Sequence, residues 1–187
     1  MQSLMPRINV ARTAFAALVV AALFVARTGK AGGEDDATAA KVKTSKHTLL
    51  EGVQSAQKGN GAAISAKIEF EDGKLQLSVY TAKAGLEKDA EHNVLIELQG
   101  ETTSAKWDPK TEVFEDREHL GRASAQLTAL QTASISLEDA IKKASALKKG
   151  SVFSAIPSVK DGKSVVVVLI ATPAGKSLHV VIDETTK

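Results

Sequence analysis

The chain has 187 residues, of which 43% are hydrophobic, 25% charged and only 4% aromatic. That size allows one ordinary domain or two small ones, and the few aromatic side chains leave little basis for stacking on nucleobases. The 24 Lys and Arg and the 22 Asp and Glu residues are interspersed, without a run that would indicate an anionic polymer or a membrane surface as partner. The sequence contains no cysteine, which excludes a disulfide framework and a lipid-modified cysteine.

The first predicted element is a secretory signal peptide over residues 1–31. Arg7 and Arg12 precede an apolar run of about 14 residues that ends at Ala26, and small residues follow up to Ala31. This run is shorter than the roughly 20 apolar residues that cross a bilayer as a helix. We therefore expect a secreted or periplasmic protein of a bacterial envelope, attached to the membrane only if the segment is not cleaved. Without these residues the chain would carry 20 basic and 22 acidic residues, a formal net charge of −2.

Residues 32–46, with the sequence GGEDDATAAKVKTSK, are predicted to form a flexible linker. They show no apolar periodicity and are rich in Gly, Ala, Thr and charged residues, a composition that buries little apolar surface. The structured part of the chain is therefore expected to begin near His47.

Two short segments carry the same helix-start signal. In each, a hydroxyl residue is followed three positions later by an acid. The hydroxyl can accept from the amide of the acid, while the carboxylate reaches back to the amide of the hydroxyl residue. Each signal opens a predicted helix of about three turns that ends at a glycine, the residue that best adopts a left-handed cap. The residues are Thr48, Glu51 and Gly59 in the first segment and Ser136, Asp139 and Gly150 in the second.

Each predicted helix is followed by an apolar run, an Asp-Gly-Lys turn and two further apolar runs. Asp-Gly between such segments predicts a β-hairpin, because Gly accepts the positive φ that the turn requires. The turns begin at Asp72 and Asp161, 24 and 25 residues after the corresponding helix caps. The sequence therefore predicts an α+β fold made of two repeats, each with one helix and a three-stranded antiparallel sheet, over residues 47–101 and 134–187.

Residues 102–133 are predicted to join the repeats through a turn and a linker helix. Pro109 in the WDPK segment disfavours helix at the residue before it and fixes its own φ, which favours a turn. Trp107, at the start of this turn, is a candidate anchor for a partner, and packing between the two units is the competing interpretation. A broad apolar stripe then predicts a helix over about residues 112–132, formed by Val113, Leu120, Ala123, Leu127 and Leu130.

The middle strand of the second repeat is apolar on both faces. Alternate residues from Val166 to Ile170 match the core positions of the first repeat. Val165, Val167 and Leu169 occupy the opposite face, which is expected to be exposed to solvent. At about 25 cal/mol per Å2, exposing three such side chains would forfeit several kcal/mol, so we expect a cover. The other repeat, the linker segment folded as a helix, and a partner protein are the three candidate covers. In the last case these three residues would be binding residues.

The repeat resembles the PepSY domain. In the second copy, ISLEDAIKKASA is similar to the opening helix of that family. KDGKSVVVVLIA is similar to the strand pair around its D-G turn, and GKSLHVVIDETT to its closing strand, which ends in an acidic residue. The first copy, from His47 to about Glu101, is similar mainly in its pattern. The resemblance implies a non-catalytic extracytoplasmic module like those in the propeptides of thermolysin-type metallopeptidases, with peptidase inhibition or regulation as its function.

No catalytic, cofactor or metal site is predicted, and the PepSY resemblance supplies no catalytic residue. The four His residues fall in different predicted elements, without H-x-H or H-x-x-x-H spacing. His179 and Asp183 share one strand face but lie roughly 13 Å apart, too far to hold one metal ion. The KGNGAA segment lacks the spacing of a phosphate-binding loop. We therefore expect a protein that is not an enzyme and uses no cofactor.

Two functions remain open from the sequence. In the first, the protein is an extracytoplasmic binding module whose edge strands or apolar strip accept an extended segment of a partner, such as a peptidase. In the second, it is a structural or scaffolding envelope protein that self-associates, for example as a homodimer. Nucleic acid is not an expected partner in either case.

Overall fold

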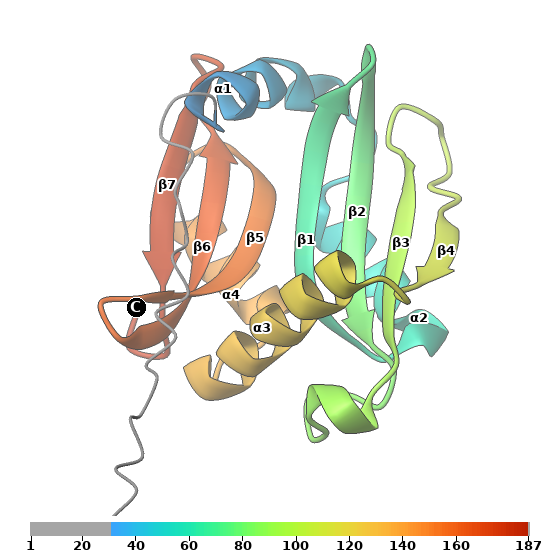
Figure 1. Cartoon of the computed structure of the whole chain (residues 1–187). Helices are drawn as coiled ribbons and strands as arrows, with labels where there is room; N and C mark the ends of the chain where they lie inside the picture. Colours follow the sequence, from blue (N-terminus) through green and yellow to red (C-terminus); the bar gives the residue numbers. More distant parts are fainter. Residues whose placement is uncertain (1–30, 187) are drawn as a thin grey trace, which may run out of the picture.

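Figure 1 shows the computed structural model of the chain, in which residues 31–186 are described. The predicted signal peptide, residues 1–31, lies outside the described residues except for Ala31. In this part of the chain, no helix is both long and apolar enough to cross a bilayer.

The described residues form an α+β fold with four α-helices and one antiparallel sheet of seven strands in the order β4-β3-β2-β1-β5-β6-β7. The predicted α+β class is therefore confirmed. The two halves of the sheet meet where Ala66 and Lys67 of β1 pair with Ala155 and Ser154 of β5. The strands are β1 (Ala62–Glu71), β2 (Lys74–Ala82), β3 (Leu95–Glu101), β4 (Lys110–Val113), β5 (Ser151–Lys160), β6 (Lys163–Ala171) and β7 (Ser177–Ile182).

The helix starts follow the predicted capping signals. In the first, the Glu51 amide donates to Thr48 Oγ1 at 3.2 Å and the Thr48 amide donates to Glu51 Oε2 at 2.8 Å, which completes the capping box. In the second, the Asp139 amide donates to Ser136 Oγ at 3.0 Å. The helices are α1 (Ala31–Lys41), α2 (Leu49–Asn60), α3 (Arg117–Ala133) and α4 (Leu137–Leu147), with two 3-10 turns, η1 (Val42–Thr44) and η2 (Ala90–His92).

The helix ends differ between the two units. Gly59 has a φ of 88°, so the regular part of α2 ends at a left-handed glycine as predicted. By contrast, α4 ends at Leu147, and the prediction that Gly150 caps it is wrong. A Cβ on Gly150 would lie 2.3 Å from the carbonyl oxygen of Ala171, so close approach of the backbone to the end of β6 accounts for this glycine.

The two predicted hairpins are present, with β1 paired to β2 and β5 paired to β6. Their turns have positive φ at both central residues: 49° and 79° at Asp72 and Gly73, and 51° and 75° at Asp161 and Gly162. This geometry matches the right-handed twist of the flanking strands, and Asp and Gly are the residues that accept it.

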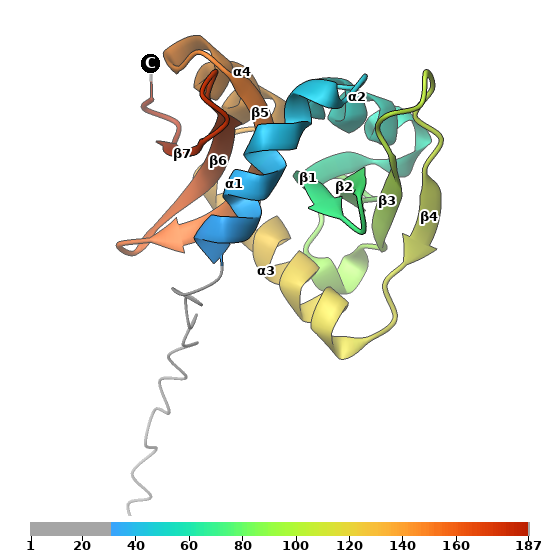
Figure 2. The same ribbon diagram turned by 90° about the horizontal axis from the view of Figure 1, so that it is seen from above.

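Helices cover both faces of the sheet (Figures 1 and 2). On one face, α2 and α4 pack side by side, and Gln57 Nε2 of α2 donates to Glu138 Oε1 of α4 at 2.7 Å. The main core lies between these helices and the sheet, where Leu49, Val53, Leu77, Ile141, Phe153 and Ile170 are fully buried. The opposite face carries α1 and α3, and we call it the α3 face.

Residues 32–46 are not the flexible linker that was predicted. Residues 31–44 form α1 and η1, and α1 contacts both β1 and the β6–β7 hairpin (Figure 2). Thr38 Oγ1 accepts a hydrogen bond from the Phe70 amide at 3.1 Å, and Ala39 and Val42 are buried. The helix is stabilised by these tertiary contacts rather than by an apolar stripe of its own, which is why local pattern analysis missed it.

The segment after Thr102 also departs from the prediction. Val113 ends strand β4 instead of joining the linker helix, and α3 begins after Asp116, whose side chain accepts from the amides of Glu118 and His119. From there α3 crosses the α3 face over β5 and β6 (Figure 1). Its residues Ala123, Leu127 and Leu130 are buried, as the apolar stripe predicted, whereas Leu120 of the same stripe is 36% exposed.

Candidate functional site

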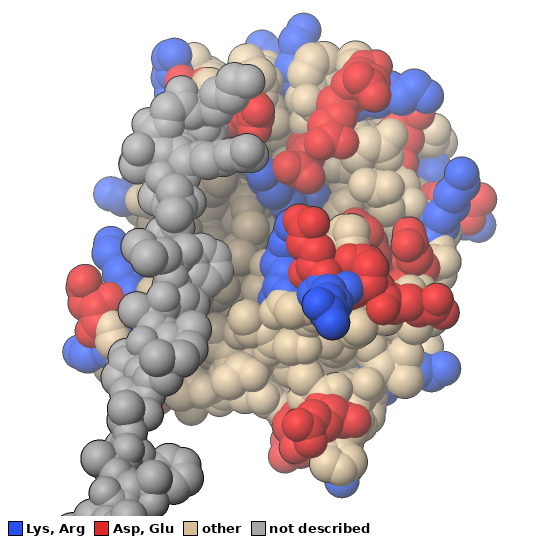
Figure 3. All heavy atoms as spheres, in the orientation of Figure 1, with Lys and Arg blue, Asp and Glu red and all other residues tan. Residues whose placement is uncertain are grey.

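The first half of the sheet presents an open polar surface on its α3 face. Alternate residues of β2 point to opposite faces, so Leu77 and Val79 are fully buried while Ser78 and Tyr80 face the α3 side. The strand register places Lys67 opposite Ser78 and Glu97 opposite Tyr80 on this same side. Figure 3 shows acidic and basic side chains gathered over this half of the face.

Between this surface and α3 lies a groove of about 340 Å3. Strands β1 to β3 form its floor, and one wall is the polar side of α3. Ser65 Oγ at the base donates to Gln126 Oε1 of α3 at 2.7 Å, which fixes the helix against the floor. We call this the polar groove, lined by Ser65, Lys67, Glu69, Glu71, Ser78, Tyr80, Glu97, Gln99, His119, Arg122, Gln126 and Ile156.

The polar groove contains charges of both signs. Lys67 Nζ lies 2.7 Å from Glu69 Oε1 and 3.8 Å from Asp35 Oδ1 of α1. Arg122, on the α3 wall, is paired with Glu118 at 2.8 Å. Among residues 31–186, Glu97 has no ion-pair partner. The groove therefore suits a ligand that carries both charges and hydrogen-bonding groups.

Tyr80 is the aromatic residue of this groove. Its ring meets that of Phe114 edge to face, with centroids 4.8 Å apart, and Phe114 in turn stacks on His119 at 5.2 Å. Burial raises the pKa of the Tyr80 hydroxyl, and the nearby Glu97 carboxylate raises this pKa further. Tyr80 therefore remains a neutral hydrogen-bond donor at neutral pH.

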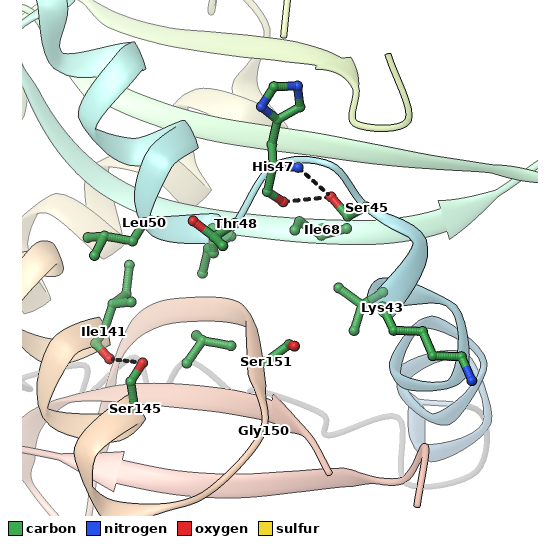
Figure 4. A pocket seen from close by; sticks show the side chains of 13 residues that line it. Lys43, Ser45, His47, Thr48, Leu50, Ile68, Ile141, Ser145, Gly150 and Ser151 are labelled. Atoms are coloured by element: carbon green, nitrogen blue, oxygen red, sulfur yellow. Dashed lines mark hydrogen bonds between the residues drawn. The ribbon is translucent and has the colours of Figure 1, made fainter. Parts of the chain in front are cut away.

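A second cavity, of about 310 Å3, lies between the start of α2 and α4 (Figure 4). Its walls include Leu50 of α2 and Ile141 of α4. Two of its hydroxyl groups are engaged locally, because Ser45 Oγ donates to the His47 carbonyl at 2.6 Å and Ser145 Oγ to the Ile141 carbonyl at 2.9 Å. This cavity offers apolar surface without a converging set of free polar groups.

The His residues do not converge on one site. Among residues 31–186, no group of three or more His, Cys, Asp or Glu side chains lies close enough to hold a metal ion. His92 pairs with Asp89 at 2.7 Å and His119 with Asp116 at 2.6 Å, each within its own element. Such pairs cap a turn and a helix, and they do not form a nucleophile-base arrangement.

The structure does not place the sequence-predicted binding residues on an open surface. Val165 and Leu169 are only 5% and 7% exposed, and Val167 is half-buried. The linker segment provides the cover, since α3 crosses β5 and β6, while α1 also reaches β6. Trp107 is 7% exposed, and its Nε1 donates to the Gly100 carbonyl at 3.2 Å, which is a packing role. The chain itself therefore covers Val165 and Leu169, and it covers Val167 in part.

The polar groove was not predicted as a site. Its floor was visible only as the polar half of an alternating strand, a pattern that equally describes any solvated sheet face. The signal that distinguishes it is the pairing of strands and helix across the fold, which joins Lys67, Tyr80, Glu97 and Arg122. No single segment of the sequence contains this constellation.

The comparisons with known proteins leave the family open. No family model matches the chain, and no curated protein matches it. A solved structure of a candidate lipoprotein from Clostridium difficile 630 is similar with a TM-score of 0.39 and 12% sequence identity, covering 76% of this chain and 90% of that one.

Proposed function

We propose that this protein is a non-catalytic extracytoplasmic binding module that binds a segment of a partner protein in the polar groove. The observation that carries the proposal is the charged, uncovered half of the α3 face, bordered by α3 and by Asp35 of α1. A peptide segment has backbone hydrogen-bonding groups and side chains of both charges, which the mixed lining can match. A single-sign polyanion or an apolar ligand would match it poorly.

The PepSY resemblance indicates the class of partner. We infer two PepSY-like units, residues 47–101 and 134–187, and three equivalences support this inference. Both units run from a helix to three antiparallel strands, both have Asp-Gly hairpins, and both first strands have a register shift near their start, at Ala63/Ser65 and Val152/Ser154. The resemblance makes a secreted peptidase the proposed partner, and inhibition or regulation of that peptidase the proposed activity. The secreted or periplasmic location rests on the signal peptide predicted at residues 1–31.

The test is capture of a peptidase from the envelope fraction by the protein expressed from its full sequence, followed by assay of that peptidase on casein. Lys67→Gln and Glu97→Gln should reduce both capture and inhibition at least fivefold without changing the circular dichroism spectrum. Lys148→Gln, which removes an exposed charge beyond the end of α4, is the matched control. Equal capture by all variants would exclude the polar groove, and capture without inhibition would exclude the regulatory role.

The alternative function is self-association in a structural role. Edge strand β7 favours it specifically, because its outer side carries backbone groups that no other strand of the described chain pairs.

A further inference from the structure

The two edges of the sheet are protected to different degrees. Strand β4 has four residues, all exposed, with Lys110 and Glu112 among them. Short, charged strands of this kind resist pairing with another chain. Strand β7 has six residues, keeps an unbroken register with β6 and contains no proline or bulge. Its Val181 side chain is 38% exposed. Of the two edges, β7 is the one that can accept a strand.

The direction of the β7 amides follows from two hydrogen bonds. The Thr172 amide donates to the Lys176 carbonyl at 2.9 Å, so this pair is bonded across the β6–β7 hairpin. In an antiparallel ladder, hydrogen-bonded and non-hydrogen-bonded residue pairs alternate. The amide of the next residue, Ser177, therefore points away from β6. It donates instead to Asp36 Oδ1 of α1 at 2.9 Å. The same alternation turns the amides of His179, Val181 and Asp183 outward.

Both ends of this outward row are closed. Asp36 occupies the Ser177 amide, and Thr186 Oγ1 accepts from the Asp183 amide at 3.0 Å. In the described part of the chain, nothing accepts from the outward amides of His179 and Val181. The edge therefore offers a window with two free donors, centred on Val180.

We propose that β7 pairs antiparallel with β7 of a second copy, with the two-fold axis at Val180. In this register His179 lies opposite the partner's Val181 and Val181 opposite the partner's His179, so the two free amides of each copy meet free carbonyls. A register centred on His179 would place Val181 opposite the partner's Ser177. A register centred on Val181 would place His179 opposite the partner's Asp183. In both cases an amide already bound within its own copy would have to be released.

Side-chain chemistry agrees with the Val180-centred register. It brings Lys176, which already pairs with Asp36 of its own copy at 3.1 Å, near the partner's Glu184 in the turn after β7. Val180, which is half-buried, meets the partner's Val180, and valine pairs are favourable across antiparallel strands. The window is its own complement about Val180, because its two free amides, at His179 and Val181, exchange places between the copies and the bound amides of Ser177 and Asp183 lie outside them; this symmetry selects a second copy of this chain as the occupant.

This inference rests on the alternative, self-association function, and it is independent of the polar groove. The groove is lined by β1, β2, β3 and α3 together with Ile156 of β5, whereas the window lies on β7 at the edge of the other half of the sheet. Loss of peptidase binding would therefore leave the dimer untouched, and loss of the dimer would leave groove binding untouched.

The first experiment is cross-linking of the full chain, which has no native cysteine. A Val180→Cys variant should form a disulfide-linked dimer under mild oxidation, because the two Cα atoms of such a pair lie about 4.5 Å apart. Val159→Cys, an exposed position on β5, is the control and should remain monomeric. Equal cross-linking of both variants, or of neither, would overturn the proposal.

The second experiment is analytical ultracentrifugation of the full chain, which does not depend on the cysteine variants. The parent should show a concentration-dependent dimer. Val181→Pro, which removes one outward amide but no bond to β6, should raise the dissociation constant at least tenfold. Glu184→Lys should weaken the dimer less than Val181→Pro, because Lys176 is also held by Asp36 of its own copy. A parent that stays monomeric up to about 100 μM, or a dimer indifferent to these changes, would contradict the inference.

Discussion

Asp36 of α1 accepts a hydrogen bond from the backbone amide of Ser177, 141 residues later in the chain, at 2.9 Å. The same carboxylate accepts from Ser177 Oγ at 3.1 Å and lies 3.1 Å from Lys176 Nζ. One side chain therefore attaches α1 to the start of β7 and closes one end of the outer edge of the sheet. Helix α1, the first helix of the described residues, is thus held by β7, the last strand.

We predict that this contact makes stability depend on acid pH. The Ser177 amide first, and then Lys176, hold the pKa of Asp36 below its ordinary value of 3.8. A lowered pKa in the folded state contributes stability above the ordinary value and loses it as the pH falls through the folded value. Asp36→Asn should therefore unfold at a lower temperature than the parent at pH 7, and the difference should shrink below about pH 4. Thermal unfolding followed by circular dichroism at both pH values measures this. A difference that stays constant with pH would contradict it.

Two glycines on helices provide a matched pair for the packing of the fold. A Cβ on Gly52 of α2 would lie 2.1 Å from Leu77 Cδ2 in the core, whereas Gly121 of α3 has no atom within 4 Å of that position. Gly121→Ala should raise the free energy of unfolding by about 0.5–1 kcal/mol through helix propensity. Gly52→Ala should lower it by up to about 2 kcal/mol, because overpacking outweighs the same gain. Urea unfolding of the two variants tests this. Stabilisation by both would show that Leu77 shifts to make room for the added methyl group without a net cost.

The covered strip on β6 gives a third prediction. Replacing Val165, Val167 and Leu169 together by Thr places three hydroxyl groups beneath α3 and α1, and should cost about 3–6 kcal/mol of unfolding free energy. Val159→Thr, at a position that is 63% exposed, should change it by less than about 0.5 kcal/mol. Chemical denaturation of both variants provides the comparison. A triple variant as stable as the parent would mean that the strip does not belong to the core.

Local signals in the sequence were sufficient for the hairpins and most helix starts. The Asp72-Gly73 turn and the Thr48 capping box are each specified by residues within four positions of one another, so a short stretch of sequence is enough to predict them. Strand β4 and helix α1 could not be found in this way. β4 is exposed along its whole length and exists only by pairing with β3, and α1 is fixed by Phe70 and Ser177.

The joining of the two halves into one sheet was equally beyond local reasoning. It depends on two residue pairs, Ala66 with Ala155 and Lys67 with Ser154, in strands separated by almost ninety residues. The apolar strip did predict that a cover was needed, because exposed Val and Leu are costly. It did not identify the cover, since each of the three candidates would bury the same side chains.

The final prediction uses Tyr80 as a reporter of the polar groove. It is the only tyrosine in the chain, so absorbance at alkaline pH follows the ionisation of this hydroxyl alone. Burial and the Glu97 carboxylate raise its pKa above the ordinary value of 10.0, so the titration midpoint should lie above pH 10. Because the folded state holds this proton more tightly than the unfolded state, the corresponding stability is complete below pH 10 and decreases as the pH rises above it.

Glu97→Gln should move the titration midpoint of Tyr80 back toward 10.0, whereas Glu184→Gln, on the exposed turn after β7, should leave it unchanged. Identical midpoints in the parent and both variants would show that the Glu97 charge does not act on Tyr80 and would remove the electrostatic basis of the groove.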